Sequence, residues 1–430
     1  MPLITAKRMP MHTLRPAMDN LVGPLRRLLR RVALAVIAAQ AATAGALIAV
    51  DSWRKRMRPR EATFPRTETA DLPVGESTVT VYTYGTVLYD DMLAAIEGAR
   101  ERVLFESFIV KDDEVGQRFK RALIAAAERG VEVFVIYDAF ANLVVKRAFF
   151  EFPPSVNVVR YPALNPGMLL LDVRKSGRDH RKLLVVDGEI GFVGGYNVGS
   201  AYATQWRDTH LRVRGPSAWE LENAFIDFWN QQRAPAQPRL PEHGSTLWES
   251  TVRVHRNVPT QMIYPIRGMY LEAIDRASVH ISITQPYFIP DRSMVRALLA
   301  AAQRGVDVRV LVPAESNHVI TDWLSRGFYA AFLRGRVTIW SFEHAMIHAK
   351  TMTVDGQWST IGTANIDRLS LTGNYEVNVE IFDRGVAQHL ERVFATDLSN
   401  STQLTMAEWE RRGPLAKGTE RLLAPLRPLL

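Results

Sequence analysis

Hydrophobic and polar positions follow one order of elements in the first half of the chain. The alternation in VTVYTY predicts a strand over 79–84, and MLAAIEGA predicts a helix over 92–99. VLFESFIV predicts a strand over 103–110, FKRALIAAAERG an amphipathic helix ending at Gly130, and VEVFVIYD a buried strand over 131–138. Alternating strands and helices are typical of an α/β fold with right-handed crossovers.

The second half of the chain repeats this order. YLEAIDRA predicts a helix over 270–277 and HISITQPYFI a strand over 280–289. VRALLAAAQRG predicts a helix ending at Gly305, and VDVRVLVP predicts the next strand over 306–313. Because AAAERGVEVFV and AAAQRGVDVRV are nearly the same sequence, the chain is expected to form two lobes of one fold, related by pseudo-two-fold symmetry.

The two lobes are expected over 75–230 and 248–400. The segment between them, QQRAPAQPRLPEHGS, is rich in proline and polar residues and predicts a linker over 231–247. A tail over 401–430 ends in ERLLAPLRPLL, which mixes apolar and basic residues. This composition fits a segment lying on a membrane surface, and it equally fits a helix docked on the body.

Positive charge is concentrated at the N-terminus. Residues 1–60 contain twelve Lys or Arg and two Asp, whereas residues 61–430 contain 41 Lys or Arg and 43 Asp or Glu. A body that binds nucleic acid would normally have a basic surplus, so no nucleic-acid partner is expected. A basic segment beside an apolar one favours attraction to anionic lipid.

An uncharged run of 19 residues, Val32–Val50, follows these basic residues. It is long enough to span a bilayer, and we predict a membrane helix at about 32–50. Lys and Arg flank the run on both sides, so the charge bias gives no orientation. Two alternatives stay open: a cleaved signal peptide, since AATAGA offers cleavage sites, and a buried helix of a soluble protein.

Two short motifs bear the candidate chemistry. HRKLLVVD runs from His180 to Asp187 and HAKTMTVD from His348 to Asp355, so both read His-x-Lys-x4-Asp. Aligning the two histidines also matches further polar and glycine positions: Lys182 with Lys350, Gly194 with Gly362, Asn197 with Asn365, and Asp208 with Glu376. A repeat of this extent indicates one site built from two halves.

Each motif is predicted to lie on a strand, a tight Asp-Gly turn and a second strand. In an extended segment residues i and i+2 face the same side, so His180 and Lys182 project together, as do His348 and Lys350. Ammonium groups beside the amides of Asn197 and Asn365 suit phosphate oxygens. An imidazole there can attack phosphorus or transfer a proton.

The acidic residues are expected to have two roles. Asp208 and Glu376 could each accept a hydrogen bond from the histidine of their own lobe, which would fix its tautomer. Asp187 and Asp355 complete the motifs and are counted with the catalytic residues, although Asp before Gly at a turn favours a structural or orienting role. A metal site is not expected, because each histidine is paired with a lysine, which repels a cation, and the chain has no cysteine.

These motifs resemble the phospholipase D superfamily, and within it the bacterial cardiolipin synthases. The resemblance covers roughly residues 79–396. The segments that show it are RDHRKLLVVDGEIGFVGGYNVG, WRDTHLRVRGPSAWELENAFIDFW, QPYFIPD, IHAKTMTVDG, IGTANIDRLS and NYEVNVEIFD. The sequence departs from many relatives in Gly-Gly before Asn197, in Gly-Thr-Ala before Asn365, and in Ser316-Asn317, where an acidic residue is expected.

The resemblance implies a fold of two phospholipase D-like lobes and a phosphohistidine intermediate. His180 is the expected nucleophile, and His348 would protonate the departing alcohol. The two lysines and two asparagines would bind the phosphoryl oxygens, and no cofactor is needed.

The implied reaction moves a phosphatidyl group to the hydroxyl of phosphatidylglycerol at the bacterial inner membrane. Phosphatidylethanolamine and cardiolipin are further candidate substrates. Hydrolysis to phosphatidic acid, a nuclease-type phosphodiesterase and an inactive binding protein are the alternatives.

Overall fold

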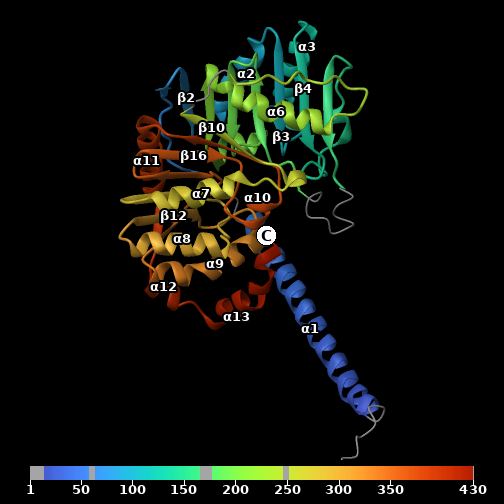
Figure 1. Ribbon diagram of the computed structural model, residues 1–430, viewed down its shortest axis with the longest axis vertical. Helices are drawn as coiled ribbons and strands as arrows, with labels where there is room; N and C mark the ends of the chain where they lie inside the picture. Colours follow the sequence, from blue (N-terminus) through green and yellow to red (C-terminus); the bar gives the residue numbers. More distant parts are fainter. Residues whose placement is uncertain (1–13, 58–62, 165–176, 246–250, 430) are drawn as a thin grey trace, which may run out of the picture.

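The computed structural model describes residues 14–57, 63–164, 177–245 and 251–429. Two lobes, each built on an eight-stranded sheet, form the body, and one long helix projects from it (Figure 1). The prediction of an α/β fold with two similar lobes and an N-terminal apolar helix is therefore confirmed.

The first lobe contains the chain from Asp71 to Gln232. Its strands are β1 (Asp71–Val74), β2 (Ser77–Tyr82), β3 (Arg102–Ser107), β4 (Glu132–Asp138), β5 (Val156–Tyr161), β6 (Lys182–Val186), β7 (Ile190–Gly194) and β9 (His210–Arg214). Its helices are α2 (Gly85–Glu97), α3 (Glu114–Glu128), α5 (Ser200–Thr204) and α6 (Trp219–Gln232).

The second lobe follows the same plan. Its strands are β10 (Val252–Asn257), β11 (His280–Thr284), β12 (Asp307–Pro313), β13 (Thr338–Phe342), β15 (Thr351–Val354), β16 (Trp358–Gly362), β17 (Glu376–Ile381) and β18 (Ser401–Leu404). Its helices are α7 (Pro265–Arg276), α8 (Arg292–Gln303), α9 (Val319–Arg334), α10 (Arg368–Thr372) and α11 (Arg384–Leu398), followed by α12 (Met406–Glu410) and α13 (Pro414–Leu423).

The two sheets have matching strand orders. The first reads β1-β2-β9-β7-β6-β3-β4-β5 and the second β10-β17-β16-β15-β11-β12-β13-β18. In each, three strands consecutive in the chain are parallel (β3, β4 and β5, and β11, β12 and β13), and the next strand of the hairpin pairs antiparallel with the first of them. The sheets extend a few residues beyond the expected lobe limits, because β1 begins at Asp71 and β18 ends at Leu404.

The predicted elements form with shifted ends. The apolar runs over 103–110 and 280–289 were expected to be strand throughout, but β3 ends at Ser107 and β11 at Thr284. The chain stays buried beyond both ends, where Val110 and Phe288 pack in the lobe cores. An apolar run therefore indicates which residues are buried, and burial continues beyond the last strand residue of β3 and β11.

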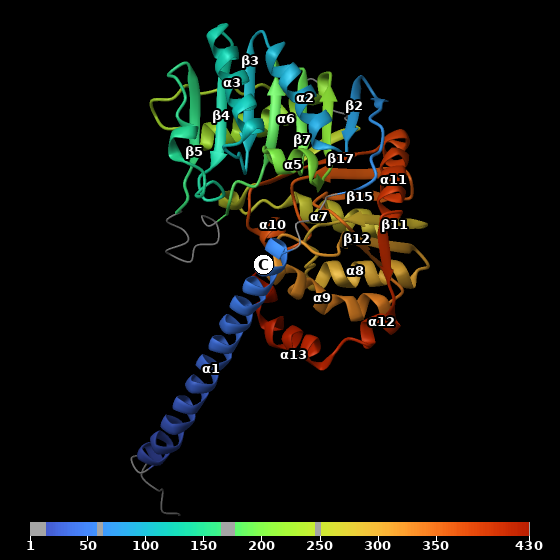
Figure 2. The same cartoon turned by 180° about the vertical axis from the view of Figure 1, so that it is seen from behind.

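The core joins the two lobes. Helices α2 and α3 cover one face of the first sheet and α6 covers the other (Figures 1 and 2). The apolar cluster under α6 continues into the second lobe, where it includes Ile361 of β16, Val377 of β17 and Tyr375, which immediately precedes β17. Strands that bear or follow the candidate motifs therefore lie at the centre of the molecule.

The N-terminal apolar segment is part of one long helix, α1 (Leu14–Met57), which is longer than the predicted 32–50. Its part from Arg26 to Arg54 is long and apolar enough to cross a membrane, although a signal sequence meets the same criterion. Gln40, in the middle of the uncharged run, donates a hydrogen bond from Nε2 to the carbonyl of Leu422 at 2.9 Å.

The C-terminal tail packs on the body and on α1. Helix α13 contacts α9 and α1, and Leu423 lies in an apolar cluster with Ile289, Leu324 and the partly buried Leu47 of α1. Of the two alternatives for this segment, the docked helix is the one present. The linker from Arg233 to Ser245 also lies on the body, through a hydrogen bond from Gln237 to the carbonyl of Val158. Residues 246–247 of the predicted linker lie outside the described residues.

Candidate functional site

The two motifs occupy equivalent hairpins of the two sheets. His180 precedes β6 and Lys182 begins it, and Lys350 immediately precedes β15. Each hairpin turns at an aspartate in the left-handed conformation, with φ of 53° at Asp187 and 54° at Asp355. The predicted strand, Asp-Gly turn and second strand are confirmed in both lobes.

Short backbone contacts join the motif of each lobe to the other lobe. The two-residue strands β8 (Trp206–Arg207) and β14 (Met346–Ile347) pair in parallel across the lobes, and Asp179 forms an equivalent bridge with Tyr375. The amide of His348 donates to the carbonyl of Arg207 at 2.7 Å, and the amide of His180 donates to the carbonyl of Tyr375 at 3.1 Å. Each histidine is thereby placed beside the acid that follows Arg207 or Tyr375.

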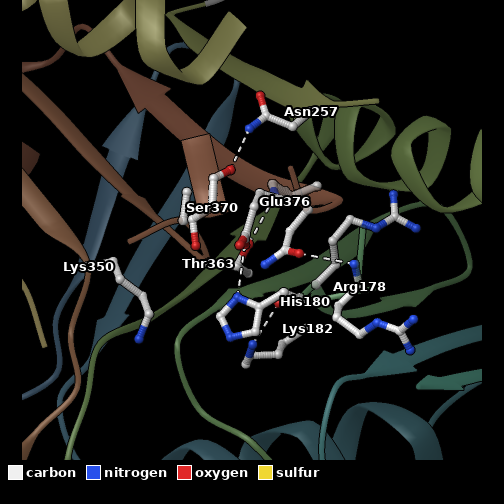
Figure 3. Close-up of polar contacts among 12 residues, drawn as sticks. Arg178, His180, Lys182, Asn257, Lys350, Thr363, Ser370 and Glu376 are labelled. Atoms are coloured by element: carbon white, nitrogen blue, oxygen red, sulfur yellow. Dashed lines mark hydrogen bonds and ion pairs between the residues drawn. The ribbon is translucent and has the colours of Figure 1, made fainter. Parts of the chain in front are cut away.

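The result is a crossed pair of hydrogen bonds between histidines and acids. His180 Nδ1 lies 3.0 Å from Glu376 Oε2, and His348 Nδ1 lies 2.6 Å from Asp208 Oδ2 (Figure 3 shows the first pair). The expectation that each acid would bind the histidine of its own lobe is therefore wrong. Its reason is the cross-lobe bridging described above, which no pattern within one lobe reveals.

A buried ion pair holds Asp208, the acid that binds His348, in place. Arg207, next to Asp208, binds Asp397 of α11 through two hydrogen bonds, Nε to Oδ1 at 2.8 Å and Nη2 to Oδ2 at 2.7 Å. Both side chains are almost fully buried. Bidentate arginine–carboxylate pairs fix geometry as well as charge, so lobe two holds the strand that presents Asp208.

The residues before the two asparagines adapt each half of the site to its acid. Gly195 leaves no room for a Cβ, which would collide with the carboxylate of Asp208. The equivalent position in the second lobe is Thr363, whose hydroxyl donates to Glu376 Oε2 at 2.5 Å. Gly-Gly before Asn197 thus leaves room for the carboxylate of Asp208. Gly-Thr-Ala before Asn365 provides the hydroxyl that binds Glu376.

Both lysines point into the site and are buried (Figure 3). Lys182 Nζ donates to the carbonyl of His180 at 2.6 Å. Lys350 Nζ bonds the carbonyl of His348 and lies 2.9 Å from its Nδ1 and 3.1 Å from its Nε2. Burial lowers the pKa of Lys182 to about 8 and that of Lys350 to about 7, so in the empty site both side chains are fully charged ammonium groups only below about pH 7.

Burial also affects the pKa values of the two histidines and the two acids. Burial and the two ammonium groups hold the pKa of His180 well below its usual range, and burial and Lys350 lower that of His348 to about 3. Burial raises the pKa of Glu376 to about 8. Burial would raise that of Asp208 too, but Lys350 and His348 lower it to about 2. The imidazoles are neutral, and Asp208 is the ionised acid.

Both asparagines that follow the motifs are buried. Asn197 accepts from the amide of Ile109 at 3.2 Å through Oδ1, and Asn365 hydrogen-bonds Asp367. The structure therefore brings together both histidines, both lysines, Asp208 and Glu376 (Figure 3 includes part of this group).

Asp187 and Asp355 do not join this group, since they lie at the opposite ends of β6 and β15 from the histidines. Asp187 accepts from the amides of Arg100, Glu101 and Arg102 at 2.8–2.9 Å. Asp355 binds the amides of residues 278–280 and the hydroxyl of Ser278. Each carboxylate thus ties its hairpin to the segment that enters the adjacent central strand.

Aromatic rings that the sequence reasoning did not single out form walls of the site. Phe108 lies against His180 with ring centroids 4.7 Å apart, and Trp206 against His348 at 5.0 Å. Tyr287 lies 6.0 Å from His348 and donates a hydrogen bond to Asn317 at 2.5 Å. Trp206 lies in the WRD segment and Tyr287 in the QPYF segment, and both segments had been noted in the sequence as part of the family resemblance.

This arrangement can perform displacement at a phosphodiester. The Nδ1 atom of each histidine is hydrogen-bonded to an acid, which directs Nε2 away from that acid, and the buried ammonium groups can stabilise charge on a phosphoryl group. Within the residues that the structure describes, no group of three or more His, Asp or Glu is placed to hold a metal ion.

Comparisons with known proteins point to one family. A sequence model of the family described as cardiolipin synthase, PLD-like domain, matches residues 92–229 and 270–398. Cardiolipin synthase from Listeria monocytogenes is 32% identical over 369 residues, covering 82% of this chain and 76% of that protein. Cardiolipin synthase 2 from Staphylococcus epidermidis is 32% identical, covering 82% and 75%.

Solved structures show the same fold. Phosphatidylserine synthase from Haemophilus influenzae superposes with a TM-score of 0.65 at 13% identity, covering 84% of this chain and 94% of that one. Polyphosphate kinase from Porphyromonas gingivalis gives a TM-score of 0.52 at 14% identity, covering 87% and 58%.

Proposed function

This chain belongs to the family of cardiolipin synthases with phospholipase D-like domains, and we propose that it moves a phosphatidyl group from one phosphatidylglycerol to another. The observation that supports this most is the crossed site, in which two histidines with opposed acids face two buried lysines. Phospholipid substrates fit the cardiolipin synthase relatives.

In the first step, the Nε2 atom of His180 attacks phosphorus and the bond from phosphorus to the glycerol headgroup breaks. The glycerol oxygen takes a proton from Nε2 of His348 and leaves. Lys182, Lys350 and the carboxamides of Asn197 and Asn365 hold the phosphoryl oxygens, on which negative charge increases. The product is a phosphatidyl group on His180.

In the second step, His348 takes the proton of a hydroxyl on a second phosphatidylglycerol. That oxygen attacks the phosphohistidine, and the bond from phosphorus to nitrogen breaks. The products are cardiolipin and unmodified His180, so protons balance over the cycle. If water is the acceptor, the product is phosphatidic acid, and the outcome depends on how well the site excludes water.

The difference between the two acids supports His348 as the proton donor. Asp208 is ionised and lies 2.6 Å from His348, so it stabilises an imidazolium there. Glu376 has a raised pKa and gives His180 less support as a cation. An anionic phosphodiester between the lysines would offset their repulsion of the His348 ring and favour uptake of the proton.

The cardiolipin synthase relatives and the N-terminal apolar helix indicate membrane association. We place the protein at the inner membrane of a bacterial cell, with α1 as its single N-terminal anchor. The basic residues on both sides of the apolar run favour anionic phospholipid at either end of the helix.

The experiment that tests this function gives the purified full chain phosphatidylglycerol in mixed micelles with EDTA, and the lipids are identified by mass spectrometry. We expect cardiolipin and free glycerol in equal amounts. Phosphatidic acid alone would establish a hydrolase instead. Formation of neither product from this lipid or from phosphatidylethanolamine would contradict phosphatidyl transfer.

The lysine pKa values predict how activity depends on pH. Because burial lowers the pKa of Lys350 to about 7 and of Lys182 to about 8, the unoccupied site loses its positive charge as the pH rises through this range. We expect kcat/KM to fall above about pH 7–8, and kcat to fall only at higher pH, since a bound phosphodiester raises both lysine pKa values. A kcat/KM that stays constant to pH 10 would contradict this assignment.

The placement of Asp187 predicts an effect on stability instead of chemistry. Asp187→Ala removes the acceptor of three backbone N–H groups and should lower the free energy of unfolding by about 1–3 kcal/mol. Urea denaturation measures this change, and kcat of the folded variant should stay within about twofold of wild type. Asp187→Asn is the control, because it keeps an acceptor oxygen and tolerates the left-handed turn. A large loss of kcat in a folded Asp187→Ala would show a catalytic role.

A further inference from the structure

A set of exposed apolar side chains lies at the carboxyl ends of β4 and β5. It consists of Phe140, Leu143 and Val144 after β4 and Leu164 after β5, and we call it the apolar rim. These side chains are 49%, 64%, 83% and 76% exposed, respectively. Large apolar groups gathered on a surface mark a contact with another apolar phase or molecule.

The rim is held rigidly, so its exposure is not the result of a loose loop. Asp138, at the end of β4, accepts from the amides of Phe140 at 2.8 Å and Ala141 at 3.0 Å. Asn142 is 4% exposed, donates to the carbonyls of Phe108 and Asp138 at 2.8 and 2.7 Å, and accepts from Val110 at 3.0 Å. Buried polar side chains thus fix the backbone while the apolar residues between and beside them point outward.

Arg178 joins the two parts of the rim. Its Nη1 donates to the carbonyls of Pro162 and Ala163 at 3.0 and 3.1 Å, next to Leu164. Its guanidinium carbon lies 5.2 Å from the ring centroid of Phe140. One side chain therefore holds the segments after β4 and β5 side by side.

The anchors of the rim also support the catalytic centre. Asp138 Oδ2 accepts from the amide of Asp179 at 3.2 Å, directly before His180. Phe108, whose carbonyl binds Asn142, places its ring against His180. A surface that contacts the rim is thus connected to His180 through two short chains of contacts, one through the buried Asp138 and one through the partly buried Phe108.

The position of the rim indicates what covers it. The carboxyl ends of β4 and β5 point toward the side of the body on which α1 projects (Figures 1 and 2). Lys146 and Arg147, both exposed, follow Val144 within three residues. Apolar side chains next to basic ones match the interface of a bilayer that contains anionic lipid.

We propose that the apolar rim inserts into the surface of an anionic phospholipid bilayer and seats the His180 half of the catalytic site against the lipid headgroups. This deepens the proposed function, on which it rests. The rim is a second contact with the bilayer, separate from α1, and it lets a lipid reach the site while its acyl chains stay in the membrane.

The absence of cysteine from the chain allows a direct test on the full-length protein. Val144→Cys receives an environment-sensitive NBD fluorophore, and the protein is reconstituted into phosphatidylglycerol and phosphatidylcholine vesicles that contain doxyl-labelled lipid. Val279→Cys is the matched control, because Val279 is 62% exposed and precedes β11 at the amino end of the sheet. We expect a blue shift and quenching at position 144 and neither at 279.

Equal quenching at both positions, or none at either, would overturn the proposal. A blue shift at 144 that depends on protein concentration and not on doxyl lipid would also overturn it, since the rim would then bind a second protein molecule. These outcomes do not depend on catalysis, so they decide the role of the rim even if the proposed function fails.

Kinetics provide the second measurement. The variant Leu143→Asp/Val144→Asp is compared with Val279→Asp on phosphatidylglycerol in vesicles and on a short-chain phosphatidylglycerol below its critical micelle concentration. We expect the rim variant to lose at least tenfold in kcat/KM on vesicles and to stay within twofold on the soluble lipid. Equal losses on both substrates would show a purely structural role and overturn the proposal. Inactivity of the wild type on both lipids would instead count against the proposed function.

Discussion

Replacement of His180 or His348 by alanine is expected to lower kcat for phosphatidyl transfer at least about 10³-fold, and the double variant is expected to be no slower than the worse single variant. One histidine forms the bond to phosphorus and the other transfers the proton, so loss of either stops the same cycle. Cardiolipin formation measured by mass spectrometry gives the rates. His243→Ala is the control, because His243 is exposed in the linker.

A substrate with an activated leaving group separates the two histidines. Phosphatidyl-p-nitrophenol needs no proton on its leaving oxygen, so His348→Ala should still release one equivalent of p-nitrophenol in a burst and form the covalent intermediate. His180→Ala should show no burst. The opposite result would make His348 the nucleophile, and near-normal turnover of either variant with phosphatidylglycerol would contradict the two-half site.

The second large effect is expected at the crossed acids. Asp208→Asn should lower kcat for phosphatidylglycerol by about 10³–10⁴-fold, because an amide beside Nδ1 of His348 favours the wrong tautomer and removes the charge that stabilises the imidazolium. With phosphatidyl-p-nitrophenol as substrate, the loss in the first step should largely disappear. Glu376→Ala removes the acceptor of the His180 Nδ1 hydrogen bond and so impairs His180, and its loss should persist with either leaving group.

This comparison tests the crossed pairing itself. If each acid served the histidine of its own lobe, Glu376→Ala would be rescued by the activated substrate and Asp208→Asn would not. Glu380→Ala is the matched control on the same strand, since Glu380 binds His255 and Trp358 outside the site. We expect the ratio of its rates with the two substrates to equal the ratio for the wild type.

The local structure of each half-site was predictable from the sequence. Alternation and an Asp-Gly pair were enough to predict the hairpin at β6 and β7 and the one at β15 and β16, since strand period and turn chemistry act over a few residues. The same period places His180 with Lys182 and His348 with Lys350. The repeat of motif, asparagine and acid in both halves predicted that two such surfaces would form one site.

Other features depended on how the lobes dock. The hydrogen bonds that pair His180 with Glu376 and His348 with Asp208 join residues 196 and 140 positions apart, and bridging between the lobes selects them. The low pKa values of Lys182 and Lys350 also result from burial at that junction. Asp187 and Asp355, although part of the motif, lie away from it because a strand of four or five residues separates them from the histidines.

The sequence by itself therefore determined that each motif forms a strand, an Asp-Gly turn and a second strand, and that its histidine and lysine project together, because those properties follow from backbone geometry over neighbouring residues. The tertiary structure alone decided which histidine each acid serves, how strongly burial shifts the lysines, and that Phe140, Leu143, Val144 and Leu164 share one surface beside the site. These properties arise from packing between segments distant in the chain, and periodicity within one segment contains no information about its partner.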